Sequence, residues 1–289
     1  MIRKKELEKM AQAKGVRSST IDKDWVLGQF VDAIYSIPRC RTDLVFKGGT
    51  CLKKCWIPDY RFSEDLDFTS INPDFVFDKP LLEEIAALVT ERAGMPVFIE
   101  SLEMLRFKNM PTGFAAIVKF WGADHRRDQQ PPEPSRWTSS IKIEIILYEK
   151  MLFPIENRPL ICEYSDQQSM TAGNIPCYSI HEALSEKLRA LIQRSYTAPR
   201  DFYDIWYLSR HVKNIDWKIV VEAFHAKMAF KNLTFTGIEQ ILNNDNDFRL
   251  NAAWDNSLKH QIAFHQMIDY KTVRADLEKL FEGIFVGAK

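Results

Sequence analysis

The stretch Phe46-Lys47-Gly48-Gly49-Thr50, with Arg61-Phe62-Ser63-Glu64-Asp65-Leu66-Asp67-Phe68 shortly after it, decides the fold of this chain. A pair of glycines has no Cβ atoms, so the backbone there can come close to phosphate oxygens. Asp65 and Asp67 are two positions apart, and on a strand both carboxylates leave one face at the separation that a divalent cation needs. The two stretches together predict a place where Mg²⁺ meets a nucleoside triphosphate.

Strands and helices alternate around these stretches. We expect strands over 44–46 and 66–69, a short helix over 50–55 between them, and a helix over 80–92 that Gly94 follows. Helices over 4–14 and 22–36 precede them, the second closed by Pro38. Further strands over 96–107, 113–121 and 140–148 follow, and the polar, proline-containing stretch 124–140 is interpreted as an exposed loop. This order predicts an α/β fold with a mixed β-sheet flanked by helices.

The pattern changes near residue 179, where the apolar spacing becomes helical. Helices are predicted near 180–195, 199–211, 216–230, 235–243, 256–268 and 271–284. The chain is therefore expected to hold N-terminal helices over 1–40, an α/β core over 41–175 and an all-helical C-terminal domain over 176–289.

Composition limits the classes of function. The 289 residues are 46% hydrophobic and 12% aromatic, which is ample for a packed core. Because 39 basic and 39 acidic residues cancel, any contact with nucleic acid must come from a local patch, which argues against a general DNA coat.

Cysteine use and hydropathy indicate the compartment. The five cysteines follow no compact disulfide pattern, and Cys51-x-x-x-Cys55 alone is weak support for zinc, so free thiols in a reducing compartment are expected. No apolar run reaches the roughly 18 residues of a membrane span, and the first residues lack the apolar core of a signal peptide. We therefore expect a cytoplasmic protein with no membrane partner.

Three carboxylates are candidate metal ligands. Asp65 and Asp67 carry like charges close together, which is costly unless a cation neutralises them. The alternative is an exposed edge strand with scattered acids, which the upstream glycine pair disfavours. Glu144 would complete the set if its strand lies beside the one with the two aspartates; taken alone, it is more simply a solvent-facing acid.

A second group of charged residues lies in the helical region. Lys187 is at the edge of the apolar stripe formed by Leu184 and Leu188, where its ammonium can lean inward to bind phosphate or reach out to solvent. Asp201 and Asp204 adjoin an apolar helix face, so at least one of them points inward and needs a partner such as Lys187. Capping of the helix start explains Asp201 equally well.

Other polar residues flank the motif. Thr50, Lys54, Arg61 and Ser63 are secondary candidates for donation to phosphate oxygens. The candidate RNA contacts are scattered arginines, which more often form an ordinary solvated surface: Arg126, Arg127, Arg189, Arg194 and Arg200. The histidines show no metal-ligand spacing, and none is assigned to catalysis.

These motifs together resemble the AbiEii/AbiGii toxin family of nucleotidyltransferases, to which MenT-type toxins also belong. The resemblance covers about residues 40–210 and is carried by Phe46 to Lys54, Arg61 to Phe68, Lys187, and Arg200-Asp201-Phe202-Tyr203-Asp204. A glycine pair followed by two aspartates is shared across the polymerase-beta-like superfamily. The Arg-x-Ser-x-Asp-x-Asp form combined with the late lysine and acids is more specific.

The resemblance implies a nucleotidyltransferase core joined to a helical C-terminal domain. It implies Mg²⁺, or Mn²⁺ in its place, held by Asp65 and Asp67, with the triphosphate contacted by Gly48, Gly49 and Lys187. Asp201, with Asp204 as the second choice, matches the late essential acid of the family.

The resemblance also implies a reaction and partners. The enzyme would transfer NMP from an NTP to an acceptor hydroxyl on RNA, such as a tRNA 3′ end, or on a protein, placed in a cleft between the core and the helical domain. Members are toxins of toxin–antitoxin and phage-defence systems and are usually paired with a separately encoded antitoxin. Two other classes stay open: a catalytically silent nucleotide-binding or partner-binding module, and a metal-dependent phosphodiesterase, for which the expected histidine-rich ligand set is missing.

Overall fold

The computed structural model describes residues 1–126, 128–194 and 198–286. The chain divides into two compact units, one made of Met1–Glu149 and Ile155–Cys177 and the other of Lys150–Pro154 and Tyr178–Lys289. The first unit holds the diglycine stretch, and the second holds the late lysine and acids. Arg127, one of the arginines expected to contact RNA, lies outside the described residues.

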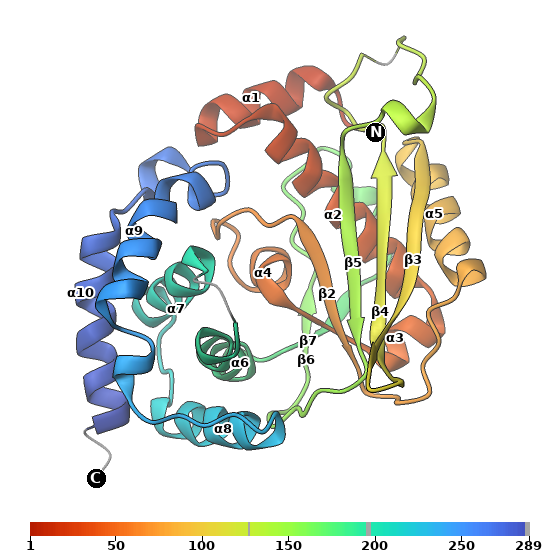
Figure 1. Cartoon of the computed structure of the whole chain (residues 1–289). Helices are drawn as coiled ribbons and strands as arrows, with labels where there is room; N and C mark the ends of the chain where they lie inside the picture. The colour runs from red at the N-terminus through yellow and green to blue at the C-terminus, as the bar shows by residue number, and fades with distance from the viewer. Residues whose placement is uncertain (127, 195–197, 287–289) are drawn as a thin grey trace. The chain divides into compact units, whose positions relative to one another are not determined.

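Within the described residues, the first unit is built on a seven-stranded mixed sheet (Figure 1). Its strands are β1 (Leu44–Lys47), β2 (Asp65–Ser70), β3 (Val97–Phe107), β4 (Met110–Phe120), β5 (Ser140–Ile146), β6 (Glu156–Pro159) and β7 (Asn174–Cys177). They lie in the order β3-β4-β5-β2-β1-β7-β6. β2 runs parallel to β5 and β1 to β7, and the other neighbours are antiparallel. This sheet confirms the predicted fold class.

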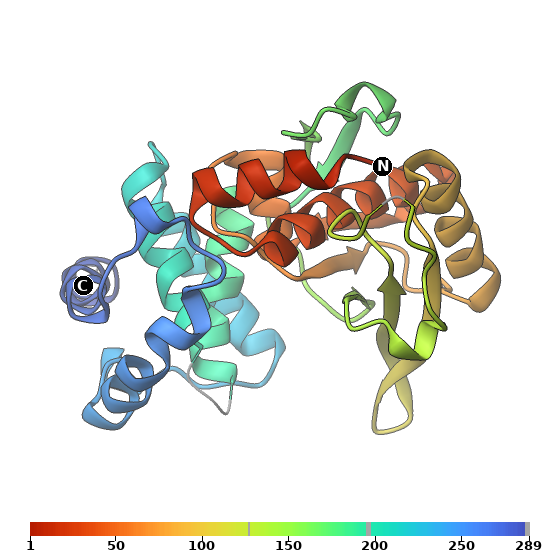
Figure 2. The same cartoon turned by 90° about the horizontal axis from the view of Figure 1, so that it is seen from above.

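Helices precede and interrupt the strands. They are α1 (Lys4–Lys14), α2 (Ser18–Ser36), α3 (Pro38–Asp43), α4 (Gly48–Cys51) and α5 (Lys79–Ala93), with a π-helical turn at Leu52–Trp56 and 3₁₀ turns at Pro134–Arg136 and Gln167–Ser169. α1 packs against α2 (Figure 2). Pro38 both follows α2 and opens α3, because its fixed φ suits the first turn of a helix.

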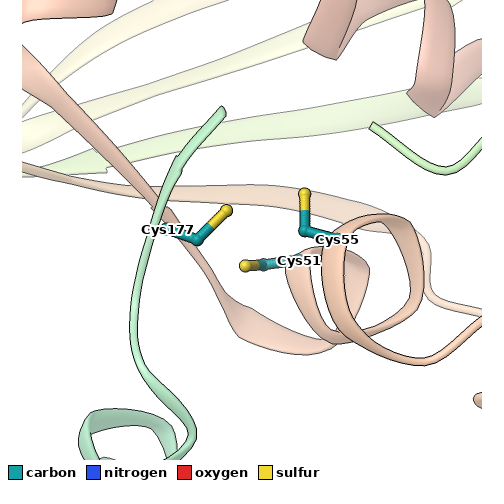
Figure 3. Close-up of side chains that lie close together, drawn as sticks. All are labelled: Cys51, Cys55 and Cys177. Atoms are coloured by element: carbon teal, nitrogen blue, oxygen red, sulfur yellow. The ribbon is translucent and has the colours of Figure 1, made fainter. Parts of the chain in front are cut away.

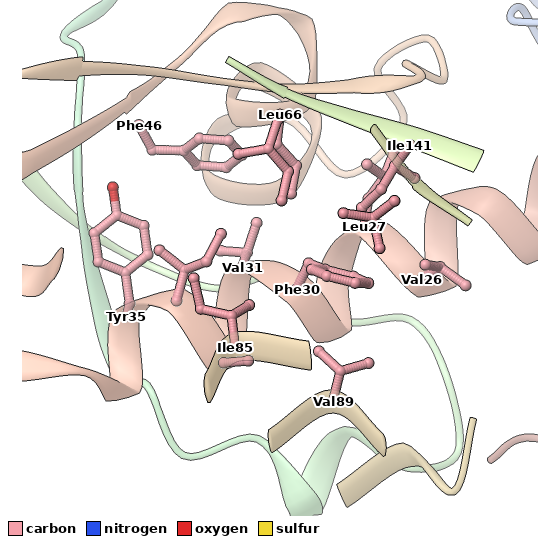
Figure 4. Packing of buried hydrophobic residues seen from close by; sticks show 14 of the residues in the cluster. Val26, Leu27, Phe30, Val31, Tyr35, Phe46, Leu66, Ile85, Val89 and Ile141 are labelled. Carbon is pink, nitrogen blue, oxygen red and sulfur yellow. The ribbon is translucent and has the colours of Figure 1, made fainter. Parts of the chain in front are cut away.

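The hydrophobic core lies between the sheet and helices α2 and α5 (Figure 4). Phe30 and Val31 of α2 pack here with Ile85 of α5, and Phe46 and Leu66 meet them from the strands; all five are fully buried. The opposite face of β2 is therefore left for the aspartates of the diglycine motif.

α2 carries acidic residues although it is buried on almost every side. The Asp22 carboxylate accepts from the Ala123 backbone N–H at 2.7 Å. The Asp32 carboxylate accepts from the backbone N–H groups of Thr171 at 2.6 Å and Ala172 at 2.7 Å. Since a buried carboxylate is tolerated only when it is partnered, these acids fix the long loops of the first unit onto α2.

β6 and β7 are strands that the sequence did not predict. β6 contains Pro159 and β7 contains Pro176, and both are only four residues long. β6 forms the sheet edge, where a missing N–H costs little. β7 joins the main sheet through one register pair, Phe46 with Cys177, which places the end of β7 beside β1.

The second unit is helical throughout its described part. Its helices are α6 (Ile180–Gln193), α7 (Pro199–His211), α8 (Trp217–Phe230), α9 (Asn244–Leu258) and α10 (Tyr270–Phe281), with 3₁₀ turns at Ile238–Gln240 and Phe264–Gln266 and a π-helical turn at Glu282–Val286. Among the helices of the described residues, none is both long enough and apolar enough to cross a membrane.

Two helices of the second unit were placed wrongly from the sequence. The segment 235–243 contains only the turn Ile238–Gln240, and 256–268 contains the end of α9 and the turn Phe264–Gln266. The helix α9 lies between these two segments. It begins there because the Asn243 side chain accepts from the Asn246 backbone N–H at 2.9 Å and caps the helix. The polarity of this stretch favours a loop, which is why the helix was not predicted.

A fully buried ion pair holds the segment 150–154 in the second unit. Lys227 of α8 and Glu182 of α6 lie 2.5 Å apart, and their side chains are 0% and 1% exposed. Glu182 also accepts from the backbone N–H groups of Leu152 at 2.8 Å and Phe153 at 2.9 Å, while Lys227 donates to the Lys150 carbonyl at 2.8 Å. Both charges are thus matched within the unit.

Candidate active site

Gly48 is the point where the Asp67 carboxylate approaches the backbone most closely. β1 and β2 pair so that Lys47 lies opposite Asp67, and Gly48 follows at once as the first residue of α4. Gly48 has a φ of +78°, and a Cβ added to it would lie 2.3 Å from Asp67 Oδ2. Only glycine fits this position, for both its backbone conformation and its space.

Gly49 is lined by two of the expected phosphate donors. A Cβ at Gly49 would lie 3.0 Å from both Arg61 Nη2 and Ser63 Oγ. Arg61 is buried and also donates to the Phe62 carbonyl at 3.1 Å. The structure therefore brings Arg61 and Ser63 to the diglycine, as a site for phosphate oxygens requires.

Thr50 and Lys54 are occupied elsewhere. The Thr50 hydroxyl donates to the Asp65 carbonyl at 2.5 Å, so it fastens α4 to β2. The Lys54 ammonium lies 2.6 Å from Asp24 Oδ2, and both side chains are buried. Tyr164 also donates to that carboxylate at 2.7 Å, and this arrangement lowers the Asp24 pKa although burial alone would raise it. These contacts give Thr50 and Lys54 structural tasks and do not favour a phosphate-binding role.

The strand pairing places Glu144 beside the two aspartates. Leu66 and Phe68 of β2 are fully buried, so Asp65 and Asp67 leave the other face of the strand. β5 runs parallel to β2, with Glu144 opposite Asp67. Glu144 could join the two carboxylates only if its strand lay next to β2. β5 is the neighbour of β2, so this condition is met.

Lys142 brings a positive charge to this acidic face. It lies opposite Asp65 in the register and pairs with Glu144. Burial opposes its charge, but the hydrogen bond to Glu144 and the attraction of Glu144, Asp65 and Asp67 outweigh it and raise the Lys142 pKa above its usual range. In the structure as described, the carboxylate oxygens of Asp65, Asp67 and Glu144 do not all lie within 4.8 Å of one another. The side chain of Lys142 is 41% exposed and can swing away.

The second unit holds the late lysine between the two late acids. Lys187 Nζ lies 2.6 Å from Asp204 Oδ2 and 3.7 Å from Asp201 Oδ1. Asp204 is fully buried and Asp201 nearly so, while Lys187 is 12% exposed. Arg194 adds a second cation, 3.1 Å from Asp201 Oδ2. Lys187 is therefore the cationic partner that both buried acids need. Arg194 is a second cationic partner for Asp201.

A pocket of about 250 Å³ opens beside this cluster, within the second unit. Asp201, Arg194 and Phe202 line it from one side, and Asn246 and Arg249 of α9 line it from another. Its lining is mixed, because Arg249 adds a positive charge to the Arg194–Asp201 pair while Leu191 and Ile241 are apolar.

Two of the remaining candidate RNA contacts, Arg126 and Arg189, have local partners. Arg126 pairs with Asp128 at 2.8 Å on an exposed loop. Arg189 is buried and donates to Gln193. Arg200 is half-buried in the first turn of α7. These contacts are local and do not by themselves form an RNA-binding surface.

Sequence reasoning missed two charged partners at these clusters. Arg194 was considered only as an RNA contact, although it lies seven residues before Asp201 across a helix junction. Asp24 was hidden within the apolar pattern of α2, and only its buried position shows why Lys54 turns toward it. The charge on an otherwise apolar helix was the available signal.

Known proteins resemble this chain in sequence and in fold. A family model described as Nucleotidyl transferase AbiEii toxin, Type IV TA system, matches residues 29–279. The structure is similar to MenT4, a nucleotidyltransferase toxin from Mycobacterium tuberculosis H37Rv, with a TM-score of 0.66 and 17% identity over 97% of this chain and 89% of that one. It is also similar to JHP933 from Helicobacter pylori, with a TM-score of 0.54 and 15% identity over 94% of each chain. These two likenesses show a shared fold. No curated protein matches the sequence.

Proposed function

The chain belongs to the AbiEii family of nucleotidyltransferase toxins, and from this premise we propose that it transfers NMP from an NTP to an acceptor hydroxyl in a magnesium-dependent reaction. The acceptor oxygen forms a bond to the α-phosphorus, the bond to the bridging oxygen of pyrophosphate breaks, and the hydroxyl loses its proton. The observation that supports this most is the contact of the Asp67 carboxylate with Gly48, beside Arg61 and Ser63 at Gly49.

The residues present fit a divalent cation. Asp65 and Asp67 share a strand face, and Glu144 lies on the neighbouring strand opposite Asp67, so the donors are the hard oxygens that Mg²⁺ prefers. Gly48 lets the backbone lie close to the Asp67 carboxylate, since a Cβ there would come within 2.3 Å of Asp67 Oδ2. When bound, Mg²⁺, or Mn²⁺ in its place, neutralises phosphate charge and lowers the pKa of the attacking hydroxyl.

The remaining parts of the first cluster are proposed to position the triphosphate. The Gly48-Gly49 backbone admits phosphate oxygens, and Arg61 and Ser63 donate hydrogen bonds to them. Lys142 holds the place of a cation among the carboxylates until the nucleotide enters, and then leaves Glu144 free to act as the third ligand.

The second cluster is proposed to bind phosphate and to take part in the transfer. Lys187 supplies a point charge for phosphate, and Asp204 fixes the position of its ammonium at 2.6 Å. Asp201 is proposed as the late essential acid, which orients the acceptor or the lysine. The pocket beside Asp201 and Arg194 is a candidate place for part of the nucleotide or of the acceptor.

We propose RNA as the acceptor, with a tRNA 3′ end as the first candidate, and a protein hydroxyl as the alternative. The reaction would take place in the cytoplasm, where NTPs and tRNA are present, and a cognate antitoxin protein would control it. The family description names a toxin of a toxin–antitoxin system, which supports the cognate antitoxin.

The experiment that tests the proposal follows labelled phosphate. The protein is incubated with each α-labelled NTP, Mg²⁺ and total cellular RNA, with and without EDTA. Label is expected in RNA, in a reaction that EDTA stops and added Mg²⁺ restores. Label in protein would redirect the acceptor, and NTP binding without transfer would show a silent binding module and overturn the proposal.

Substitutions at Asp67 test the residue assignment. Asp67→Asn is expected to slow transfer by on the order of 100-fold or more, because a charged ligand is lost while the size of the side chain is kept. Glu64→Gln is the matched control, since Glu64 is an exposed acid on the same stretch and is expected to keep the wild-type rate. A wild-type rate in Asp67→Asn would remove the metal assignment.

A further inference from the structure

Three cysteine sulfurs converge inside the first unit, and none of them belongs to a residue that the proposed reaction uses. The Sγ atoms of Cys51, Cys55 and Cys177 all lie within 4.8 Å of one another (Figure 3). Among the described residues, no other group of three or more histidine, cysteine or acidic side chains has its ligand atoms within 4.8 Å of one another. The three side chains are 2%, 1% and 0% exposed, respectively.

The fold places these thiols together from two distant parts of the sequence. Cys51 ends α4 and Cys55 lies one turn later in the π-helical turn, so both side chains share one side of the helix. Cys177 is the last residue of β7 and is fixed beside β1 by its register pair with Phe46. The cluster therefore joins β7 to the helix that follows β1.

The electrostatics of the cluster favour partial ionisation. Hydrogen bonds from Cys177 and Cys51 lower the Cys55 pKa to about 5 despite its burial, and the positive charges of Lys54 and Arg158 act in the same direction. Burial raises the Cys51 pKa well above its usual range. The Cys177 thiol donates to the Ile175 carbonyl at 3.2 Å.

A buried cysteine is usually only a small apolar residue, and Cys40 shows that case in this chain. Cys40 is 0% exposed in the same core, and burial raises its pKa to about 12. Cys51, Cys55 and Cys177 differ from it because their sulfurs point at one another. A metal ion requires its three sulfur ligands to converge, whereas simple packing does not require this.

We propose that Cys51, Cys55 and Cys177 form a binding site for a soft, thiophilic metal ion, and that Cu(I) is the ion it prefers. Thiolate ligands select soft ions such as Cu(I) and also bind Zn²⁺. Structural zinc almost always takes four ligands in a tetrahedron. The described residues supply three, and all three are buried.

The charge balance also favours a monovalent ion. Two of the three thiols release their protons to solvent as the metal enters. Two thiolates, one thiol and one Cu(I) leave a single negative charge, which the nearby Lys54 and Arg158 offset. No oxidant or reductant is consumed, because the copper stays in the Cu(I) state.

The test uses the full reduced protein, titrated without oxygen with Cu(I) held by the chelator bathocuproine disulfonate. We expect one Cu(I) per chain, a higher thermal unfolding midpoint for the loaded protein, and three sulfur neighbours in the copper X-ray absorption spectrum. Cys40→Ser is the matched control, because it changes an equally buried thiol outside the cluster, and it should keep the stoichiometry. Cys177→Ser should lose it.

The wild-type protein alone can overturn the proposal, so a variant that fails to fold does not affect the test. Failure to take copper from the chelator, or fewer than three sulfur neighbours, would exclude the three-sulfur site. Tighter retention of Zn²⁺ than of Cu(I) in a competition between the two ions would exclude the assignment to copper. Loss of copper binding in Cys40→Ser as well as in Cys177→Ser would place the metal elsewhere.

Discussion

At the scale of single residues, the Asp67 carboxylate lies close to the side of Gly48 where any other residue would carry a Cβ. A methyl group there would have to occupy space 2.3 Å from Asp67 Oδ2, and the φ of +78° is itself unfavourable for any other residue. Gly49 differs, because its neighbours at 3.0 Å are the ends of the Arg61 and Ser63 side chains, which can shift. The two adjacent glycines should therefore respond differently to substitution.

Gly48→Ala is expected to slow nucleotidyl transfer by on the order of 100-fold, because the new Cβ displaces Asp67 from its place by an ångström or more. Gly94→Ala separates this collision from backbone strain, since Gly94 has a φ of +62° with nothing within 4 Å of an added Cβ. Urea unfolding should show a loss of about 1 kcal/mol for both variants from the left-handed backbone, while only Gly48→Ala loses activity. Equal rates for the two variants would show that the close approach at Gly48 has no role in transfer.

The sequence predicted the parts of the first cluster that depend on local rules. Side chains two residues apart on a strand share one face, and this rule alone puts Asp65 and Asp67 on the same side of β2. It did not predict that Lys54 turns to Asp24 or that Thr50 fastens α4 to β2, because both contacts join residues that only the folded chain brings together. The roles of the site residues in transfer stay predictions.

At the scale of elements, helices with strong apolar periodicity were predicted best. The predicted ranges 4–14 and 199–211 have the same bounds as α1 and α7. The prediction for the region after α8 was wrong because the pattern of its helix is weak. This helix begins at the capping residue Asn243, and the apolar residues of its buried face are only Leu250, Trp254 and Leu258. β6 and β7 were missed because strands of four residues that contain proline carry almost no pattern.

Lys227 on α8 shows how one buried charge can hold elements together. Lys227→Met is expected to destabilise the second unit by about 3–5 kcal/mol, because Glu182 keeps its charge in the interior and loses its counter-ion. The loss would be measured as a lower midpoint in urea unfolding. Lys218→Met, on an exposed position of the same helix, is the control and should change stability by less than about 0.5 kcal/mol. Similar midpoints for the two variants would mean that Glu182 does not need the pair.

At the scale of the whole molecule, stability should depend on pH through Asp22, a buried acid of α2. Burial raises the Asp22 pKa from 3.8 to about 6, although the Ala123 N–H opposes this shift by donating to the carboxylate at 2.7 Å. The folded chain therefore holds a proton on Asp22 at pH values where the unfolded chain has released it. The stability that this proton contributes is fully present below about pH 4 and is lost as the pH rises through about 6.

Asp22→Asn removes this titration and keeps an acceptor for the Ala123 N–H. The free energy of unfolding of the wild type, minus that of Asp22→Asn, is expected to fall by about 3 kcal/mol or less between pH 4 and pH 7, since each pKa unit corresponds to about 1.4 kcal/mol. Urea unfolding at several pH values measures both proteins, and groups that titrate identically in the two cancel in the difference. A flat difference for Asp22→Asn would mean that its carboxylate ionises in the folded chain as easily as in water, and a rising one would mean that the hydrogen bond from Ala123 outweighs burial.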